Sequence, residues 1–408
     1  MYSLSLTSLR IVFWVYLLLV FGQSTLQRLY AYRSMQADGE PTATPPGGKW
    51  PSVDVLIPCF NERPELLLAC CESIAAQRYE GRLCAWLVDD GSHNVDDLEP
   101  TYRRFEYRDG WDVVRHPANQ GKRRAQDSGL WRGNGEFVLT VDSDTRIDPD
   151  GVRRLVQAIL ADDVGGATGT VGVWNVSASW LTRLIRKRYD LLCEERAAQS
   201  FHGAVLCCAG PFSIYRRSIL RQVWSSYLGQ RIRGRHCTNG DDNHLANLVL
   251  AAGYRTVFEH RAKAFTNVPT SIFEFVRQQI RWNRTFYREL AWTVPNLWRR
   301  RRFYLAWDVT AQLLLPFLLI LASAICAGQL MLSGDDLAQF LTRLAAMAIV
   351  HAVFVVVQMR DPMFFWYGAL YVALLLPVRV HALATLGHVN WMTRKASSQR
   401  SWVAEEAP

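Results

Sequence analysis

The order of apolar and polar positions divides the chain into a central segment and two apolar ends. Residues 50–300 alternate short apolar runs with polar loops and amphipathic stretches, which is typical of a soluble α/β domain. Near the N-terminus, Ile11–Phe21 is continuously apolar. After residue 303, three stretches reach membrane-spanning length, namely Ala311–Leu332, Leu337–Met359 and Met363–Leu386. One such run is compatible with a buried soluble core, but three in succession predict an integral membrane protein.

The first apolar run is predicted to be an uncleaved membrane anchor. It is short for a complete span, but Arg10, Arg28 and Arg33 flank it, and its Trp and Tyr residues stand where an interface belt would hold them. A cleaved signal peptide is the alternative, although no small-x-small site follows the run. The predicted organisation is an anchor at 1–36, a Pro- and Gly-rich linker at 37–50, an α/β domain at 51–302, membrane or interfacial helices at 303–390 and a tail at 391–408.

Within the α/β domain, apolar runs and helical stretches alternate at the spacing of a doubly wound, mostly parallel sheet. The predicted strands are Val53–Ile57, Cys84–Val88, Trp111–Arg115 and Phe137–Val141, and the predicted helices include one from Pro64 to about Gln77, one beginning near Trp180 and Leu245–Ala252. No Gly-x-Gly-x-x-Gly and no Walker A motif follows any of these strands. This absence argues against a dinucleotide-dependent dehydrogenase and a P-loop NTPase.

Carboxylates stand at the carboxyl ends of two predicted strands. Asp142 and Asp144 follow the fourth strand, and Asp89 and Asp90 follow the second. Open α/β sheets bind their ligands at this edge, and Mg²⁺ or Mn²⁺ prefers oxygen ligands of this kind. The Asp-x-Asp pair therefore predicts a divalent metal that holds the diphosphate of a nucleotide-activated donor. A helix cap is the alternative, because Asp148 follows closely.

The second half of the domain adds two further clusters. Asp241 and Asp242 follow a Gly and precede a helix, so that one carboxylate could cap the helix and the other could act as a general base. Further on, an amphipathic helix is predicted at 272–290, beside the membrane. An interfacial helix with snorkelling Arg and anchoring Trp would account for part of it, but not for two adjacent Gln residues. Amides, a guanidinium and an indole suit a diphosphate and a sugar, and here they are Gln278, Gln279, Arg281 and Trp282.

Charge and cysteine content place the α/β domain in the cytosol. The formal net charge is +9, with basic clusters at Arg183–Arg188, Arg231–Arg235 and Arg299–Arg302. Nucleic-acid binding is one explanation of such clusters, but basic residues next to membrane segments more often mark the cytoplasmic leaflet, so no nucleic-acid partner is predicted. The nine Cys residues include no Cys-x-x-Cys and no spacing typical of zinc, so reduced thiols are expected.

Read in order, these clusters resemble the family 2 processive glycosyltransferases of the GT-A fold. The matching segments are Asp89–Ser92, Asp142–Asp144, Gly240–Asp242 and Gln278–Trp282. Glu195–Ser200, Cys207–Pro211 and Tyr215–Arg217 narrow the resemblance to the branch that contains the rhizobial chitooligosaccharide synthases, which make the backbone of nodulation factors, and the bacterial hyaluronan synthases. The N-terminal region looks more like the former, whereas Arg281–Glu289 and Leu139–Thr145 look closer to the latter.

The resemblance implies roles for individual residues. Asp90, with Asp89 beside it, would contact the uridine, and Asp144 and Asp142 would serve a Mg²⁺ or Mn²⁺ ion. Asp242 would be the general base, with Asp241 next to it. The remaining residues expected to bind the UDP-sugar donor or the growing glycan are Glu62, Lys122, Gln278, Gln279, Arg281, Trp282 and Arg394.

Two departures from the family pattern affect these assignments. Asn243 stands where the family has Arg, and Met392 replaces the Gly of the segment that leads to Arg394. Three complete spans after a cytosolic domain would also place Arg394 outside, although its expected role requires it inside. Pro377 and Arg379 within the last apolar run are typical of a re-entrant or interfacial segment, so the number of complete spans stays open.

The sequence therefore predicts a multi-pass enzyme of the cell membrane that transfers N-acetylglucosamine from UDP-N-acetylglucosamine to a β-linked glycan, with inversion. A hyaluronan synthase that alternates two donors is the nearest alternative. A polyprenyl-phosphate sugar transferase would share the first two motifs but does not need the Gln-Gln-x-Arg-Trp element, and a non-enzymatic membrane adaptor would not need the carboxylates. Few spans leave little room for a wide pore in one monomer, so a homo-oligomer or a short product is expected.

Overall fold

The computed structural model describes residues 6–37, 45–232, 234–237, 240–300, 303–332 and 337–388. The predicted α/β domain at 51–302 is called the catalytic half below. A mixed sheet lies at its centre, with the strands in the order β3-β2-β1-β4-β7-β6-β10-β5. The strands are β1 (Val53–Cys59), β2 (Leu83–Asp89), β3 (Trp111–Arg115), β4 (Phe137–Thr140), β5 (Arg146–Ile147), β6 (Val164–Val173), β7 (Ser213–Arg216) and β10 (Arg255–Thr266), with β8 (Arg231–Ile232) and β9 (Arg235–His236) as a separate pair.

The first half of the sheet has the predicted parallel arrangement. β1 pairs in parallel with both β2 and β4, and β2 pairs in parallel with β3. β7 then lies antiparallel between β4 and β6, so the doubly wound pattern is interrupted there. β1 continues past Pro58 to Cys59, because its pairing with β2 extends as far as Asp89. The third strand has the predicted bounds, and the others differ from them by one or two residues.

Helices cover both faces of this sheet, and on each face apolar side chains of the helices pack against apolar side chains of the strands. The helices are α2 (Pro64–Ala75), α3 (Val95–Glu106), α4 (Lys122–Arg132), α5 (Gly151–Ile159), α6 (Trp180–Phe201), α7 (Arg217–Leu228) and α8 (Asp241–Ala251). Val55 and Ile57 of β1 are completely buried with Leu67 of α2, whereas Leu56, which points to the other face, packs with Leu130 of α4. The alternation along β1 therefore fills two apolar layers, as expected for a central strand.

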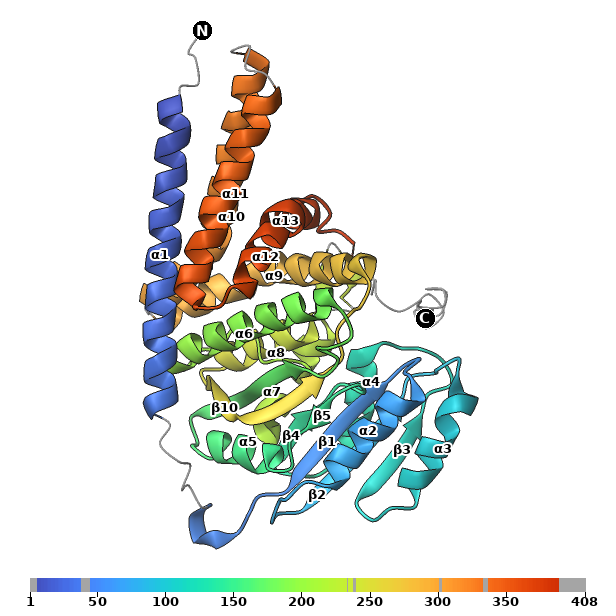
Figure 1. The fold of residues 1–408 in the computed structure, drawn as a ribbon. Helices are drawn as coiled ribbons and strands as arrows, with labels where there is room; N and C mark the ends of the chain where they lie inside the picture. Colours follow the sequence, from blue (N-terminus) through green and yellow to red (C-terminus); the bar gives the residue numbers. More distant parts are fainter. Residues whose placement is uncertain are drawn as a thin grey trace.

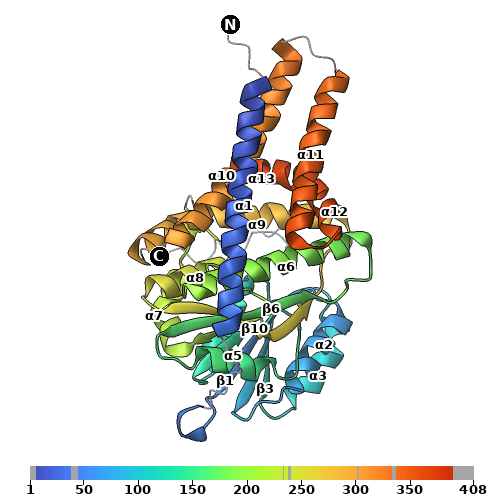
Figure 2. The same ribbon diagram turned by 60° about the vertical axis from the view of Figure 1, so that its left-hand side comes forward.

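Three long helices project away from the catalytic half. α1 (Leu6–Ala37), α10 (Phe303–Leu332) and α11 (Leu337–Met359) extend to the same side, and α9 (Ile272–Arg300) crosses beneath them against the catalytic half (Figures 1 and 2). Among the described residues, three segments are long and apolar enough to cross a membrane, namely Ile11–Gln36, Phe303–Ala322 and Met363–Ala384. Leu341–Val357 in α11 is also apolar but shorter. The anchor is thus longer than the strict apolar run, because α1 continues beside α6.

The last apolar run bends instead of forming one straight helix. It consists of α12 (Met363–Leu370), a π-helical turn (η2, Tyr371–Leu375) and α13 (Leu376–Ala384). Arg379 donates hydrogen bonds to Asn283 of α9 and to the backbone of Gln312 in α10, both at 3.0 Å. Beyond α13, Arg284 of α9 donates to Thr385 Oγ1 at 2.7 Å. This run therefore returns to α9 rather than reaching the far ends of α10 and α11 (Figure 1).

We predict that residues 385–388, which follow α13, lie on the same membrane face as the catalytic half. In membrane vesicles of one orientation, a protease should remove a C-terminal epitope tag and degrade the catalytic half together, because α9 holds residues 385–388 beside the catalytic half. A tag inserted between α10 and α11 serves as the control and should be protected in the same vesicles. A C-terminal tag that behaves like the control would contradict the re-entrant path.

Candidate active site

The predicted polar residues gather at one edge of the sheet. β1, β2 and β4 are parallel neighbours, so the residues that follow them emerge on the same side. Glu62 follows β1, and Asp142 follows β4. Asp89 is the last residue of β2, and Asp90 comes directly after it. Glu62, Asp89 and Asp90 are buried, and Asp142 is partly exposed. The carboxylates predicted at the strand ends thus lie at one edge of the sheet.

Asp90 holds the loop that leads into α4. Its Oδ1 accepts hydrogen bonds from the backbone N–H of Gln120 at 2.9 Å and from His116 Nδ1 at 2.9 Å, and its Oδ2 accepts from the N–H of Gly121 at 2.7 Å. Burial raises the pKa of Asp90, although these three bonds act to lower it. Asp90 thus fixes the position of Lys122, the first residue of α4.

Glu62 and Asp89 also support loops at this edge. The Oε2 of Glu62 accepts a hydrogen bond of 2.7 Å from Ser143, the residue between the two Asp residues of the Asp-x-Asp pair. Asp89 Oδ1 accepts hydrogen bonds from the side chain and the backbone of Ser92. Both carboxylates were predicted to bind substrate, and in this structure each accepts a hydrogen bond from a neighbouring loop.

Lys122 joins the two halves of the site. Its Nζ lies 2.7 Å from Asp142 Oδ1, after β4, and 2.7 Å from Asp241 Oδ2, at the start of α8. Burial favours the neutral amine, but the two carboxylates outweigh that effect and raise the pKa of Lys122. One ammonium group therefore links residues that are about a hundred positions apart in the sequence.

The two carboxylates at the start of α8 have different environments. Burial would raise the pKa of Asp241, but the Lys122 ion pair lowers it. Burial, and after it the charge of Asp241, raises the pKa of Asp242. Asp242 also accepts a hydrogen bond of 3.6 Å from the thiol of Cys207. The pair thus separates into one firmly ionised carboxylate and one with higher proton affinity, as a general base requires.

Gly210 leaves space between these charged groups. A Cβ built at this position would lie 3.1 Å from Lys122 Nζ and 3.8 Å from both Asp142 Oδ2 and the Cβ of Asp242. The glycine thus lines the space that Lys122, Asp142 and Asp242 share. Gly210 belongs to the segment Cys207–Pro211, which contributes to the family resemblance.

α9 brings the Gln-Gln-x-Arg-Trp element to the same site. Burial lowers the pKa of Arg281, while the charges of Asp241, Asp242 and Asp142 oppose that shift, so the guanidinium interacts electrostatically with these carboxylates. The ring of Trp282 lies 6.1 Å from that of Tyr189 in α6. Gln278 Oε1 and Gln279 Nε2 are buried without a hydrogen-bond partner among the described residues. Such groups have capacity left for a ligand.

The donor atoms at the Asp-x-Asp pair match a hard divalent cation. Asp142 and Asp144 supply carboxylate oxygens, and Asp144 Oδ1 accepts a hydrogen bond of 3.1 Å from Thr266, which orients it. Within the described residues, no group of three or more His, Cys, Asp or Glu side chains forms a complete protein cage. Two carboxylates with open positions are typical of Mg²⁺ or Mn²⁺ that also binds a diphosphate.

Three residues of the site were not found from the sequence. Tyr189 lies within the helix that was predicted to begin near Trp180, and Cys207 lies in a segment that contributed only to the family resemblance. His116 directly follows the third predicted strand, and polar residues at strand ends were the signal that could have identified it. Arg394 lies outside the described residues, so its predicted role stays a prediction.

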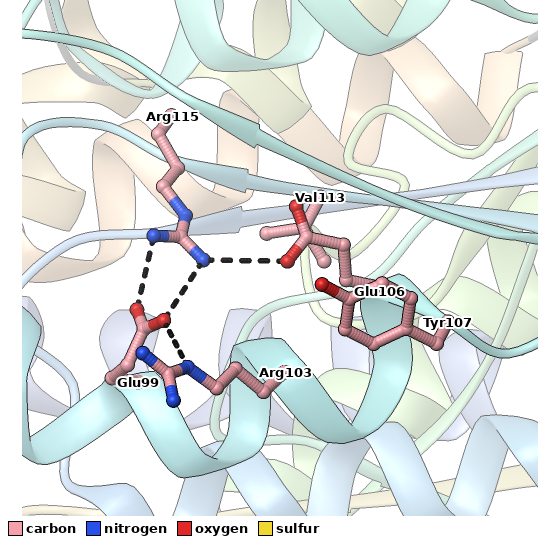
Figure 3. Close-up of a pocket in the computed structure, with 6 residues that line it drawn as sticks. All are labelled: Glu99, Arg103, Glu106, Tyr107, Val113 and Arg115. Atoms are coloured by element: carbon pink, nitrogen blue, oxygen red, sulfur yellow. Dashed lines mark hydrogen bonds and ion pairs between the residues drawn. The ribbon is translucent and has the colours of Figure 1, made fainter.

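A separate surface hollow of about 640 Å³ lies between α3 and β3. Its charged side chains pair with one another, as the bonds of Glu99 with Arg103 and Arg115 show (Figure 3). None of the residues that line it belongs to the carboxylate cluster. We therefore place the active site at the edge of the sheet and not in this hollow.

Comparison with known proteins agrees with this geometry. Residues 54–224 match the family described as glycosyl transferase family 2. N-acetylglucosaminyltransferases of Mesorhizobium japonicum and Sinorhizobium fredii are 41% and 40% identical to this chain, over 87% and 89% of its length and 84% and 91% of theirs. The chain belongs to glycosyl transferase family 2. The family resemblance seen in the sequence is thus confirmed, and the protein is a glycosyltransferase.

The fold of this glycosyltransferase also matches a solved structure. A mannosyltransferase from Pyrobaculum calidifontis, in complex with GDP-Man and Mn²⁺, superposes with a TM-score of 0.61 at 20% identity. The match covers 88% of this chain and 98% of the other. At this identity the comparison supports the fold alone, and it confirms the predicted GT-A-like sheet.

We predict that Gly210→Val weakens UDP binding by roughly tenfold, because its side chain would occupy the space between Lys122 and Asp242. Calorimetric titration of the solubilised enzyme with UDP measures the effect. Gly22→Val is the matched control, since a Cβ there meets no atom within 4 Å. Equal UDP affinity of the two variants would contradict the position assigned to Gly210.

Proposed function

We propose that this glycosyltransferase transfers N-acetylglucosamine from UDP-N-acetylglucosamine to a growing β-1,4-linked glycan, processively and with inversion at the anomeric carbon. The observation that carries the proposal is the identity of 36–41% to relatives named N-acetylglucosaminyltransferase, which extends over 98% of this chain in the relative from Rhizobium meliloti. The cluster of Lys122, Asp142, Asp241 and Asp242 supports it, because such a site can hold a diphosphate and remove a proton.

The acceptor hydroxyl would react in a single displacement. Asp242 accepts its proton while the oxygen forms a bond to the anomeric carbon, and the bond from that carbon to UDP breaks on the opposite face. The raised pKa of Asp242 favours this proton transfer. Arg281 and Lys122 lie where negative charge develops on the departing UDP, and they stabilise it electrostatically.

A divalent metal fits the charge balance of the site. Four carboxylates, of Asp142, Asp144, Asp241 and Asp242, stand against the two cations Lys122 and Arg281, so a diphosphate would add negative charge to a site that is already acidic. Mg²⁺ or Mn²⁺ held by Asp144 and Asp142 would neutralise the diphosphate of the leaving UDP. Asp90, Asp89 and Glu62 would order the loops around the nucleotide, and Gln278, Gln279 and Trp282 would contact the sugars.

We infer that the enzyme is a multi-pass protein of the cell membrane with its catalytic half in the cytosol, where UDP-sugars are made. The boundaries 51–302 and 303–390 would separate the catalytic half from the membrane or interfacial helices, with the anchor at 1–36 and the linker at 37–50. The apolar helices α1, α10 and α11 support contact with a bilayer. A homo-oligomer, or a short product, would allow the glycan to leave.

We predict that Asp242→Asn lowers the rate of sugar transfer by at least about 100-fold, because the amide cannot accept the proton of the acceptor. UDP binding should persist within about threefold, since Lys122 pairs with Asp142 and Asp241 instead. Transfer rates in membranes and UDP titration of the solubilised variant give the two values. Transfer by this variant at the wild-type rate would remove Asp242 from the role of base.

The donor is tested directly in membranes that contain the enzyme. We expect labelled UDP-N-acetylglucosamine alone, with Mg²⁺, to yield oligomers that chitinase degrades, and EDTA to abolish incorporation. Membranes with the Asp242→Asn variant are the control. Incorporation that waits for UDP-glucuronic acid would indicate a hyaluronan synthase instead, and no incorporation with either donor would contradict the proposed donor sugar.

A further inference from the structure

A buried polar network lies directly behind the carboxylate pair. Glu289, in α9, accepts hydrogen bonds at Oε1 from Gln230 Nε2 (2.6 Å) and at Oε2 from His244 Nδ1 (3.1 Å) and Asn247 Nδ2 (3.4 Å). Gln230 in turn accepts a bond of 2.7 Å from Arg123. Each of these five side chains is at least nine-tenths buried. One carboxylate therefore accepts hydrogen bonds from α8 and from the chain that follows α7.

The network joins three segments that each carry a residue of the active site. His244 is two positions beyond Asp242 on α8, and Arg123 is the residue after Lys122 on α4. Glu289 lies eight residues beyond Arg281 on α9, on the same continuous helix. Glu289 is thus connected to all three of these segments, which carry the proposed base Asp242, the ammonium of Lys122 and the stretch of α9 expected to bind the acceptor.

The packing of α8 on α9 is close enough for this connection to matter. Gly240 directly precedes α8 and has a φ of +74°. A Cβ at this position would lie 2.5 Å from the side chain of Thr285 in α9. Asn296 of α9 also donates a bond of 2.9 Å to the backbone of Asn247. Contacts on both sides of Glu289 therefore leave little freedom for one helix to slide along the other. Glu289 lies between these two contacts along α9.

We propose that Glu289 is a positioning residue which holds the base of α8 in register with the acceptor-binding stretch of α9, so that the sugar hydroxyl rather than water receives the transferred sugar. This inference rests on the proposed function. When water replaces the acceptor, the bond from the anomeric carbon to UDP still breaks and the proton still leaves, but the products are free sugar and UDP. A misplaced base therefore changes which nucleophile reacts.

This proposal has a readout that does not depend on how much enzyme is folded. Loss of folded protein lowers sugar incorporation and UDP release by the same factor, so their ratio stays constant. Loss of register lowers incorporation more than release, because hydroxyl attack depends on alignment and water is mobile. The quantity to measure is labelled N-acetylglucosamine incorporated per UDP released, in the same membranes.

The test compares Glu289→Gln with two reference variants of the full chain. In Glu289→Gln, an NH₂ group replaces one carboxylate oxygen, so that a donor faces the surrounding donors and a hydrogen bond is lost. We expect the amount of N-acetylglucosamine incorporated per UDP released to fall by roughly tenfold or more. Glu274→Gln makes the same change at an exposed position of α9 and should keep the wild-type ratio. In the double variant Gln230→Glu with Glu289→Gln, donor and acceptor are exchanged across the bond, and the ratio should recover.

The outcomes separate this inference from the proposed function. If the wild type incorporates no N-acetylglucosamine, the proposed function fails before Glu289 is tested. If the wild type is active and Glu289→Gln keeps its ratio, or if the double variant leaves the loss in full, Glu289 is not a positioning residue. A fall in the ratio for the single variant with recovery in the double variant supports the proposal.

Discussion

The ion pairs of Lys122 are the interaction on which the site depends. Asp142 and Asp241 come from opposite halves of the catalytic domain, and the cation that both contact offsets the repulsion between the two carboxylates. Lys122 supplies that cation because Asp90 fixes the loop before it. The central sheet brings the strand ends together, and this one ammonium connects them to α8.

The membrane helices and the catalytic half share α9. α9 carries Arg281, whose charge interacts with the carboxylates, and Asn283 and Arg284, which follow shortly after it, bind the segment around α13. A movement of α9 would therefore affect both the carboxylate cluster and the membrane helices.

A site residue could be predicted from the sequence where a local pattern marks it, but not where its role depends on residues far away in the sequence. Asp90 and Asp142 were identifiable because a strand followed by a carboxylate is a local pattern, and the parallel sheet brings such ends together. The roles of Tyr189, Gly210 and Glu289 could not be predicted from a local pattern, because they arise from contacts with residues far away in the sequence. α9 continues ten residues past its predicted end despite Pro295, because Asn296 bonds to α8.

The charge arrangement also bears on how the site would accept its donor. Lys122 pairs with both Asp142 and Asp241 and so offsets part of the repulsion between them. A diphosphate that arrives with a divalent cation brings both signs of charge. Asp142 and Asp144 would hold such a cation, whose charge would offset that of the diphosphate. Lys122 has three N–H donors, so it could pair with a phosphate oxygen as well as with Asp241, and it would thus connect the donor site to the carboxylates of α8.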